Sequence, residues 1–133
     1  MTVTVDSDVK ITKQVQKFLD LVMDSTDLVH CNVYSFDNGT RHSIEFEYWS
    51  DLGEDVLMYL SMTDLSIDNI VHAMYEEAEN FDAEDHATML YDRHGEGGTP
   101  TSLRALLEDA DEQQEMLNTI YDKMLELREL VNA

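Results

Sequence analysis

Apolar and polar residues change their spacing along the chain, and each change predicts a different kind of element. Between Asp8 and Asp24, apolar residues recur at the spacing of one face of an amphipathic helix. From Leu28 to Phe36, apolar and polar residues alternate, as they do in a strand with one buried face. After Ser66 the helical spacing returns and continues toward the C-terminus. The pattern therefore predicts a helix, a β region and a second helical region.

The alternating region predicts an antiparallel β-meander. Asn38-Gly39 follows the first strand, and such a pair favours a hairpin because both central residues of a type I′ turn need positive φ. We expect a second strand at residues 41–49 and a third at residues 55–62. Three antiparallel strands in sequence order are the simplest topology for this run.

Three helices are predicted after the strands. Ser66 has the side chain of an N-cap for the first of them, and Asp82 caps a shorter helix at residues 83–91. Thr99 and Pro100 predict the start of a long last helix, because a proline at the first helical position loses no hydrogen bond. The expected fold is one α+β domain over residues 1–133: an N-terminal helix, a three-stranded antiparallel meander, two shorter helices and one long C-terminal helix.

Composition places this fold in an aqueous compartment. Of the 133 residues, 43% are hydrophobic, which is enough for an ordinary core despite the high charge. The chain has no apolar run long enough to cross a bilayer, and its N-terminus lacks the features of a signal peptide. Cys31 has no partner for an internal disulfide and occupies an apolar strand position, so we expect a small buried hydrophobe. The prediction is a cytoplasmic protein with no membrane partner.

The charge changes the functional picture most. The chain has 29 acidic and 8 basic residues, for a net charge of −21. Between His42 and Asp122 there are 21 acids and two arginines, so this stretch carries −19 of that total. Direct binding to nucleic acid or to an anionic membrane is therefore unfavourable.

The predicted helices stack like charges. On the last helix, Glu108, Asp111, Glu112 and Glu115 share one face, and each such pair destabilises a helix by a few tenths of a kcal/mol. Two interpretations remain open. In the first, the charge serves solubility or adaptation to high salt. In the second, which we favour, the carboxylates imitate nucleic-acid phosphates and bind to a basic surface of another protein.

The sequence contains no motif for catalysis or metal binding. It lacks HExxH, paired CxxC and EF-hand patterns, and the glycine-rich stretch at residues 95–98 lacks the lysine of a phosphate-binding loop. We therefore expect no enzyme activity, no cofactor and no metal site.

The size, charge and order of elements resemble those of small phage and mobile-element anti-CRISPR proteins that inhibit type II-A Cas9 as DNA mimics. The segment at residues 81–117 is also similar to a pattern in small uncharacterised proteins of bacterial mobile elements. The first resemblance implies an inhibitor in the cytoplasm of a bacterial host, which fills the basic cleft where Cas9 arginines read a short DNA motif. The alternative is a module for another basic partner, such as a restriction enzyme, a histone-like protein or a repressor.

On this hypothesis, acids of the sheet and of the helices that follow it replace phosphates, and a nearby tryptophan helps to anchor the contact. The candidate partner-binding residues are Glu45, Glu47, Trp49, Asp51, Glu54, Asp55, Asp64, Asp68, Glu76, Glu77, Glu79, Glu84 and Asp85. The long last helix leaves a homodimer open as a further alternative.

Overall fold

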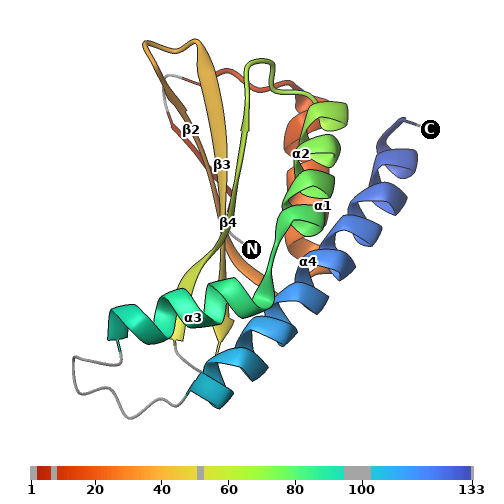
Figure 1. Ribbon diagram of the computed structural model, residues 1–133. Coiled ribbons are helices and arrows are strands. Elements are labelled where there is room, and N and C mark those ends of the chain that lie inside the picture. The colour runs from red at the N-terminus through yellow and green to blue at the C-terminus, as the bar shows by residue number, and fades with distance from the viewer. Residues whose placement is uncertain (1–2, 7–8, 51–52, 95–102, 133) are drawn as a thin grey trace.

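The computed structural model describes residues 3–6, 9–50, 53–94 and 103–132. These residues form a β-sheet with three helices, α1, α2 and α4, packed along one of its faces (Figure 1). In chain order the elements are β1 (Val3–Val5), α1 (Lys13–Ser25), β2 (Leu28–Phe36), β3 (Arg41–Ser50), β4 (Gly53–Met62), α2 (Ile67–Asn80), α3 (Ala83–His94) and α4 (Leu103–Asn132).

The sheet is four-stranded and mixed, so the expected fold of a helix followed by a three-stranded antiparallel meander is wrong. Strands β2, β3 and β4 do pair antiparallel in sequence order, but β1 precedes the first helix and pairs parallel with β2. Parallel neighbours need a crossover connection, and α1 supplies it. Val3 and Val5 pack against the core, while Thr4 between them is exposed. This strand of three residues is thus held in place by contacts with residues that are distant in the sequence.

Helix α1 begins later than the predicted start at Asp8. Thr12 is its N-cap, and the Thr12 Oγ1 accepts a hydrogen bond from the Val15 amide at 3.1 Å. Further upstream, the sheet continues as far as Asp6, whose amide donates to the Val33 carbonyl at 2.9 Å. Thr12 therefore sets the helix start.

The predicted hairpin between β2 and β3 is present, with its turn one residue earlier than the Asn-Gly pair. The Gly39 amide donates to the Phe36 carbonyl at 3.1 Å, which places Asp37 and Asn38 at the central positions. Their φ angles are 51° and 57°, the positive values that a type I′ turn needs. Gly39 follows with φ of 83°, so three successive residues lie in the left-handed region.

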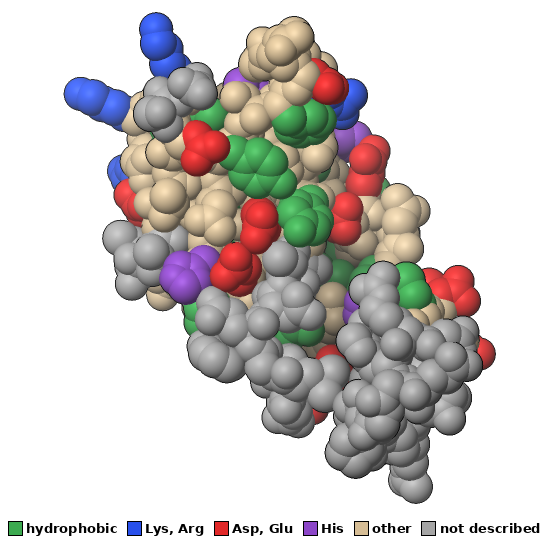
Figure 2. Space-filling model, turned by 90° about the vertical axis from the view of Figure 1, so that its left-hand side faces the viewer, with side chains coloured by type: hydrophobic (Ala, Val, Ile, Leu, Met, Phe, Trp, Pro, Cys, Tyr) green, Lys and Arg blue, Asp and Glu red, His purple; other side chains and the backbone are tan. Residues whose placement is uncertain are grey.

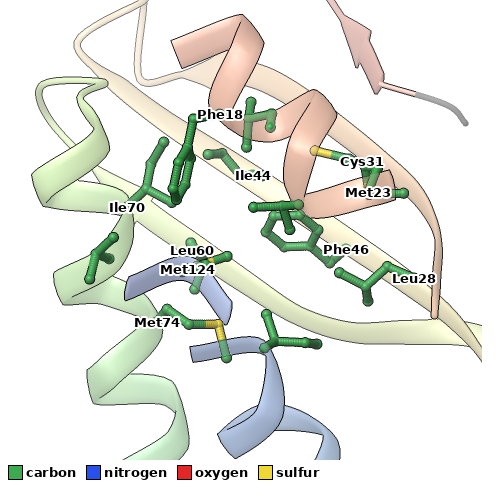
Figure 3. Close-up of a cluster of buried hydrophobic side chains, with 14 of the residues drawn as sticks. Phe18, Met23, Leu28, Cys31, Ile44, Phe46, Leu60, Ile70, Met74 and Met124 are labelled. Atoms are coloured by element: carbon green, nitrogen blue, oxygen red, sulfur yellow. The ribbon is translucent and has the colours of Figure 1, made fainter. Parts of the chain in front are cut away.

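The core lies between the sheet and the helices (Figure 3). Phe18 of α1 and Phe46 of β3 are both fully buried there. Cys31 is buried as predicted, and burial, helped by the charge of Asp20, raises the pKa of its thiol to about 12. A buried hydrogen bond of 3.2 Å, from the Tyr48 hydroxyl to Gln113 Oε1, ties β3 to α4. The other large side chains with almost no exposure are Leu19, Ile44, Leu60, Ile70, Met74, Leu117, Ile120 and Met124.

The two predicted helix caps after the sheet are confirmed. The Asn69 amide donates to Ser66 Oγ at 3.2 Å, and the Asp85 amide donates to Asp82 Oδ1 at 3.0 Å. Helix α3 runs to His94, slightly beyond its predicted end, and the predicted cap at residues 99–100 lies outside the described residues.

Helix α4 is 30 residues long and crosses the helical layer beside α1 and α2 (Figure 1). One side of it carries the buried stripe, which consists of Ala110, Gln113, Leu117, Ile120, Met124 and Leu127. The stripe is used within the fold, so a homodimer through it has no support here. Across the described ranges, no helix combines the length and apolar character needed to span a bilayer.

Candidate interaction surfaces

The face of the sheet opposite the helices is the first candidate surface, and we call it the open face. Figure 2 shows this side of the molecule, where hydrophobic side chains gather with acidic ones between them. Side chains alternate between the two faces of a strand, so the residues between the core positions belong to it. The described open face includes Thr4 of β1, His30, Asn32, Tyr34 and Phe36 of β2, Arg41, Ser43, Glu45 and Glu47 of β3, and Tyr59 and Ser61 of β4.

The strand register arranges the open face in rows across β2, β3 and β4. In one row Glu45 lies between Asn32 and Tyr59, and in the next Glu47 lies beside His30. The Nδ1 atom of His30 lies 3.2 Å from the Glu47 carboxylate. Tyr59 is 50% exposed, which is unusual for so large an apolar ring. The open face therefore combines carboxylates with aromatic surface.

Three further predicted residues, Trp49, Glu54 and Asp55, lie in the strands at the far end of this sheet. Trp49 pairs with Glu54 and Tyr48 pairs with Asp55 along the β3–β4 ladder. The side chains of Trp49, Glu54 and Asp55 lie outside the described part of the structure, as does the whole of Asp51. Their membership of a binding surface stays a prediction.

The predicted acids of α2 lie in the helical layer, on the other side of the sheet, whereas α3 packs against α4 and crosses the lower end of the sheet (Figure 1). Asp68 bonds Arg128 of α4 at 3.5 Å, and His72 of the same helix bonds Glu76 at 3.0 Å. The remaining predicted acids that follow the sheet are exposed, and they are Asp64, Glu77, Glu79, Glu84 and Asp85. The sequence-predicted set is thus divided among the open face, α2 and α3 and does not form one surface.

Glu77 stands out among these acids because its pKa is raised. Partial burial of the carboxylate is the main cause, and the charge of Glu76 adds to it. Glu77 lines a shallow hollow at the corner of α2 and α3 together with Phe81, Asp85 and His86. The ionised form of Glu77 is therefore disfavoured in the folded protein.

Replacing Glu77 by glutamine should raise the melting temperature slightly at neutral pH. When a carboxyl group has a higher pKa in the folded than in the unfolded state, the protein loses stability as pH rises through the interval between the two pKa values. Above that interval the wild type is therefore less stable than it would be with a neutral side chain at this position. Below it both states are protonated, and the difference between wild type and Glu77→Gln should disappear. Thermal melts at pH 7 and near pH 3.5 test this. A Glu77→Gln variant that is less stable at pH 7 would contradict the assignment.

A second candidate surface lies along α4, and we call it the α4 ridge. It is a line of six exposed carboxylates on the side of the helix opposite the buried stripe: Glu108, Asp111, Glu115, Asp122, Glu126 and Glu129. At 3.6 residues per turn these six fall within an arc of about 60°, and at 1.5 Å per residue they span about 31 Å. Lys123 Nζ lies 3.1 Å from the carboxylate of Glu126.

Sequence reasoning recognised only the first half of this ridge. Glu108, Asp111 and Glu115 were predicted to share one face of the last helix, but they were not among the candidate binding residues. The second half continues the same spacing past Asn118, and extending the helical count to Glu129 would have found it. The apolar stripe of this helix, with Ala110, Leu117 and Met124, already indicates its buried side, and these residues are buried in the structure.

Within the described residues, no group of three or more His, Cys, Asp or Glu side chains is arranged to hold a metal ion. Comparison of the chain with protein-family models, with curated proteins and with solved structures gives no match. The function must therefore be argued from the two surfaces.

Proposed function

We propose that the protein is a binding protein without catalytic activity, which uses the α4 ridge to occupy the basic nucleic-acid-binding cleft of another protein. The observation that carries this proposal is the single line of six exposed carboxylates on α4. Acids on the outer surface of α2 add to the same negative field, because α2 packs beside α4.

The spacing of the ridge suits a surface that binds phosphates. Neighbouring ridge carboxylates are three or four residues apart, or about 4.5–6 Å along the helix axis, except for the gap between Glu115 and Asp122. Phosphates along one strand of DNA advance by about 3.4 Å, so a row of lysines and arginines that binds several phosphates can meet several ridge carboxylates. A rigid helix holds these charges in place before binding, which reduces the entropy lost on association.

Cas9 is the first partner to test. The resemblance to anti-CRISPR proteins points to it, and its arginines read a short DNA motif before the guide RNA pairs with its target. A ridge seated on these arginines would block recognition without any chemical step. A restriction enzyme, a histone-like protein or a basic repressor presents similar charge and is the alternative class of partner.

The test is a DNA-binding and cleavage assay of guide-loaded type II-A Cas9 with the wild-type protein and two charge-reversal variants. The ridge variant carries Glu115→Lys and Asp122→Lys, and the control carries Asp6→Lys and Asp24→Lys at exposed sites that lie off the ridge and outside the candidate binding residues. Both variants reduce the negative charge by the same amount.

We expect the wild type and the control to inhibit alike, and the ridge variant to lose at least about tenfold in inhibition, because each reversal places like charges in contact. Equal loss in both variants would show that only net charge matters and would contradict the ridge assignment. Full Cas9 activity with the wild type would reject Cas9 as the target, and the same pair of variants would then be assayed on the alternative partners.

A further inference from the structure

Strand β4 forms one edge of the sheet, and its second half lacks the features that usually protect such an edge. The sheet order ends at β4, and no described residue forms a backbone hydrogen bond along its outer side. Natural edge strands are commonly very short or carry charges, proline or bulges that prevent further pairing. The opposite edge, β1, is only three residues long, whereas β4 has ten. The first half of β4 has two acids, Glu54 and Asp55, and a register shift in its ladder with β3 at residues 56–58. Residues 58–62 carry no charge and pair with β3 in regular register.

The open face beside this edge has a carboxylate that is available to a cation. Glu45 is half-buried between Asn32 and Tyr59, and no described side chain forms a hydrogen bond or ion pair with it. Glu47 in the next row already has His30 within 3.2 Å. The exposed Tyr59 ring lies between Glu45 and the outer edge of β4, so a cation entering from that edge passes over an aromatic ring.

We propose that the outer edge of β4 accepts an extended, arginine- or lysine-bearing segment of a partner protein as a fifth strand. This goes beyond the proposed function, because the binding site is on the open-face side of the sheet and not on the α4 ridge. Backbone hydrogen bonds along β4 supply affinity, and pockets or charges for alternate side chains supply specificity, as in other cases of strand addition.

The dimensions of a β-sheet fit this arrangement. Neighbouring strands are about 4.8 Å apart, so an added strand would lie about 10 Å from β3. Every second side chain of the added strand points to the open face. An arginine opposite Tyr59 can therefore stack on the ring and extend its guanidinium toward the Glu45 carboxylate, and the two contacts reinforce each other.

A basic segment fits this edge better than a second copy of the chain. Two copies joined through β4 would bring two bodies of charge −21 together, and their repulsion is largest at low ionic strength. A cationic strand instead gains from the same field. The uncharged stretch at the edge permits close pairing with another strand. The negative charge around it favours a partner segment that is positively charged.

The test uses a short capped peptide in which arginine alternates with valine, and two N-methylated forms of it. One form has every arginine amide methylated and the other has every valine amide methylated. In an extended strand these two sets of amides point to opposite edges, so only one set faces β4. We expect the parent peptide and one methylated form to bind in calorimetry, and the other form to lose at least about tenfold.

Amide hydrogen exchange reports where the peptide binds. With the parent peptide, alternate amides of residues 58–62 should exchange more slowly, and the amides of α4 should not change. If both methylated peptides bind as well as the parent, the attraction is only electrostatic and the proposal fails. A protein that is already dimeric by sedimentation, with these amides protected before peptide is added, would also overturn it in favour of self-pairing.

A pair of matched variants tests the role of the open-face carboxylate. Glu45→Gln should weaken binding of the parent peptide about tenfold, whereas Glu115→Gln on the ridge removes the same charge and should change it less than about twofold. The reverse pattern would contradict the proposal. Because Glu45→Gln leaves the ridge intact, inhibition of a basic partner by that variant shows whether the proposed function survives independently of strand addition.

Discussion

Replacement of Phe46 by alanine should lower the free energy of unfolding by about 3–5 kcal/mol. Phe46 is fully buried on β3, a strand with a neighbour on each side, and helices cover its side of the sheet. Truncation removes a large apolar side chain and leaves a cavity that rigid neighbours cannot close. Since small domains are stable by only about 5–15 kcal/mol, this single change removes a large part of the total. Urea denaturation followed by circular dichroism measures it.

Phe36→Ala is the matched control for this prediction. The chemical change is identical, but Phe36 lies at the end of β2, is 36% exposed and has the Arg41 guanidinium 5.8 Å from its ring centre. We expect a loss below about 1 kcal/mol, because partly exposed positions leave no cavity. Equal losses at the two positions would show that the core does not lie where the structure places it.

Sodium chloride should stabilise the protein strongly, and this is the second large effect that we expect. Repulsion among stacked carboxylates on the helices amounts to about 1–3 kcal/mol in total if each close pair contributes a few tenths. Raising the salt from about 10 mM to about 500 mM shortens the Debye length from about 30 Å to below 8 Å and screens most of it. At about 4 °C per kcal/mol for a chain of this size, the melting temperature should rise by about 4–12 °C.

The ridge variant with Glu115→Lys and Asp122→Lys provides the control for the salt effect. It removes repulsion from the centre of the α4 ridge, so it should melt higher than the wild type at low salt and gain less from added salt. A melting temperature that is independent of sodium chloride would mean that the carboxylates do not oppose folding. Sulfate and phosphate salts are avoided, since they stabilise proteins by a different mechanism.

The elements set by local interactions could be predicted from the sequence, and those set by distant contacts could not. The strands of the meander have their own alternation, the hairpin has its Asp-Asn-Gly turn, and Ser66 and Asp82 have side chains that cap the helices behind them. Strand β1 has only three residues, and its Val-Thr-Val alternation is too short to predict a strand by itself. Its pairing with residues 31–33 depends on α1 folding back over the sheet, and no local feature of the sequence encodes that.

The candidate site was predictable in chemistry but not in geometry. The abundance of carboxylates between residues 42 and 122 and their helical spacing are properties of the sequence. Their division between the open face and the helical layer depends on which side of the sheet the helices cover. Glu45 and Glu76 are both acids in the same charged stretch, yet the sheet separates them.

Helix α4 carries its buried stripe and its carboxylate ridge on opposite sides, and this bears on how the protein can evolve. Ridge side chains contact solvent, so most substitutions there change stability by less than about 0.5 kcal/mol. Mutations at Glu115 or Asp122 can therefore accumulate without disturbing Leu117 or Met124, which lie two to nine positions away. When the partner changes, residues of the ridge can be substituted repeatedly while the fold is kept. We therefore expect ridge positions to vary quickly among related sequences and stripe positions to vary slowly.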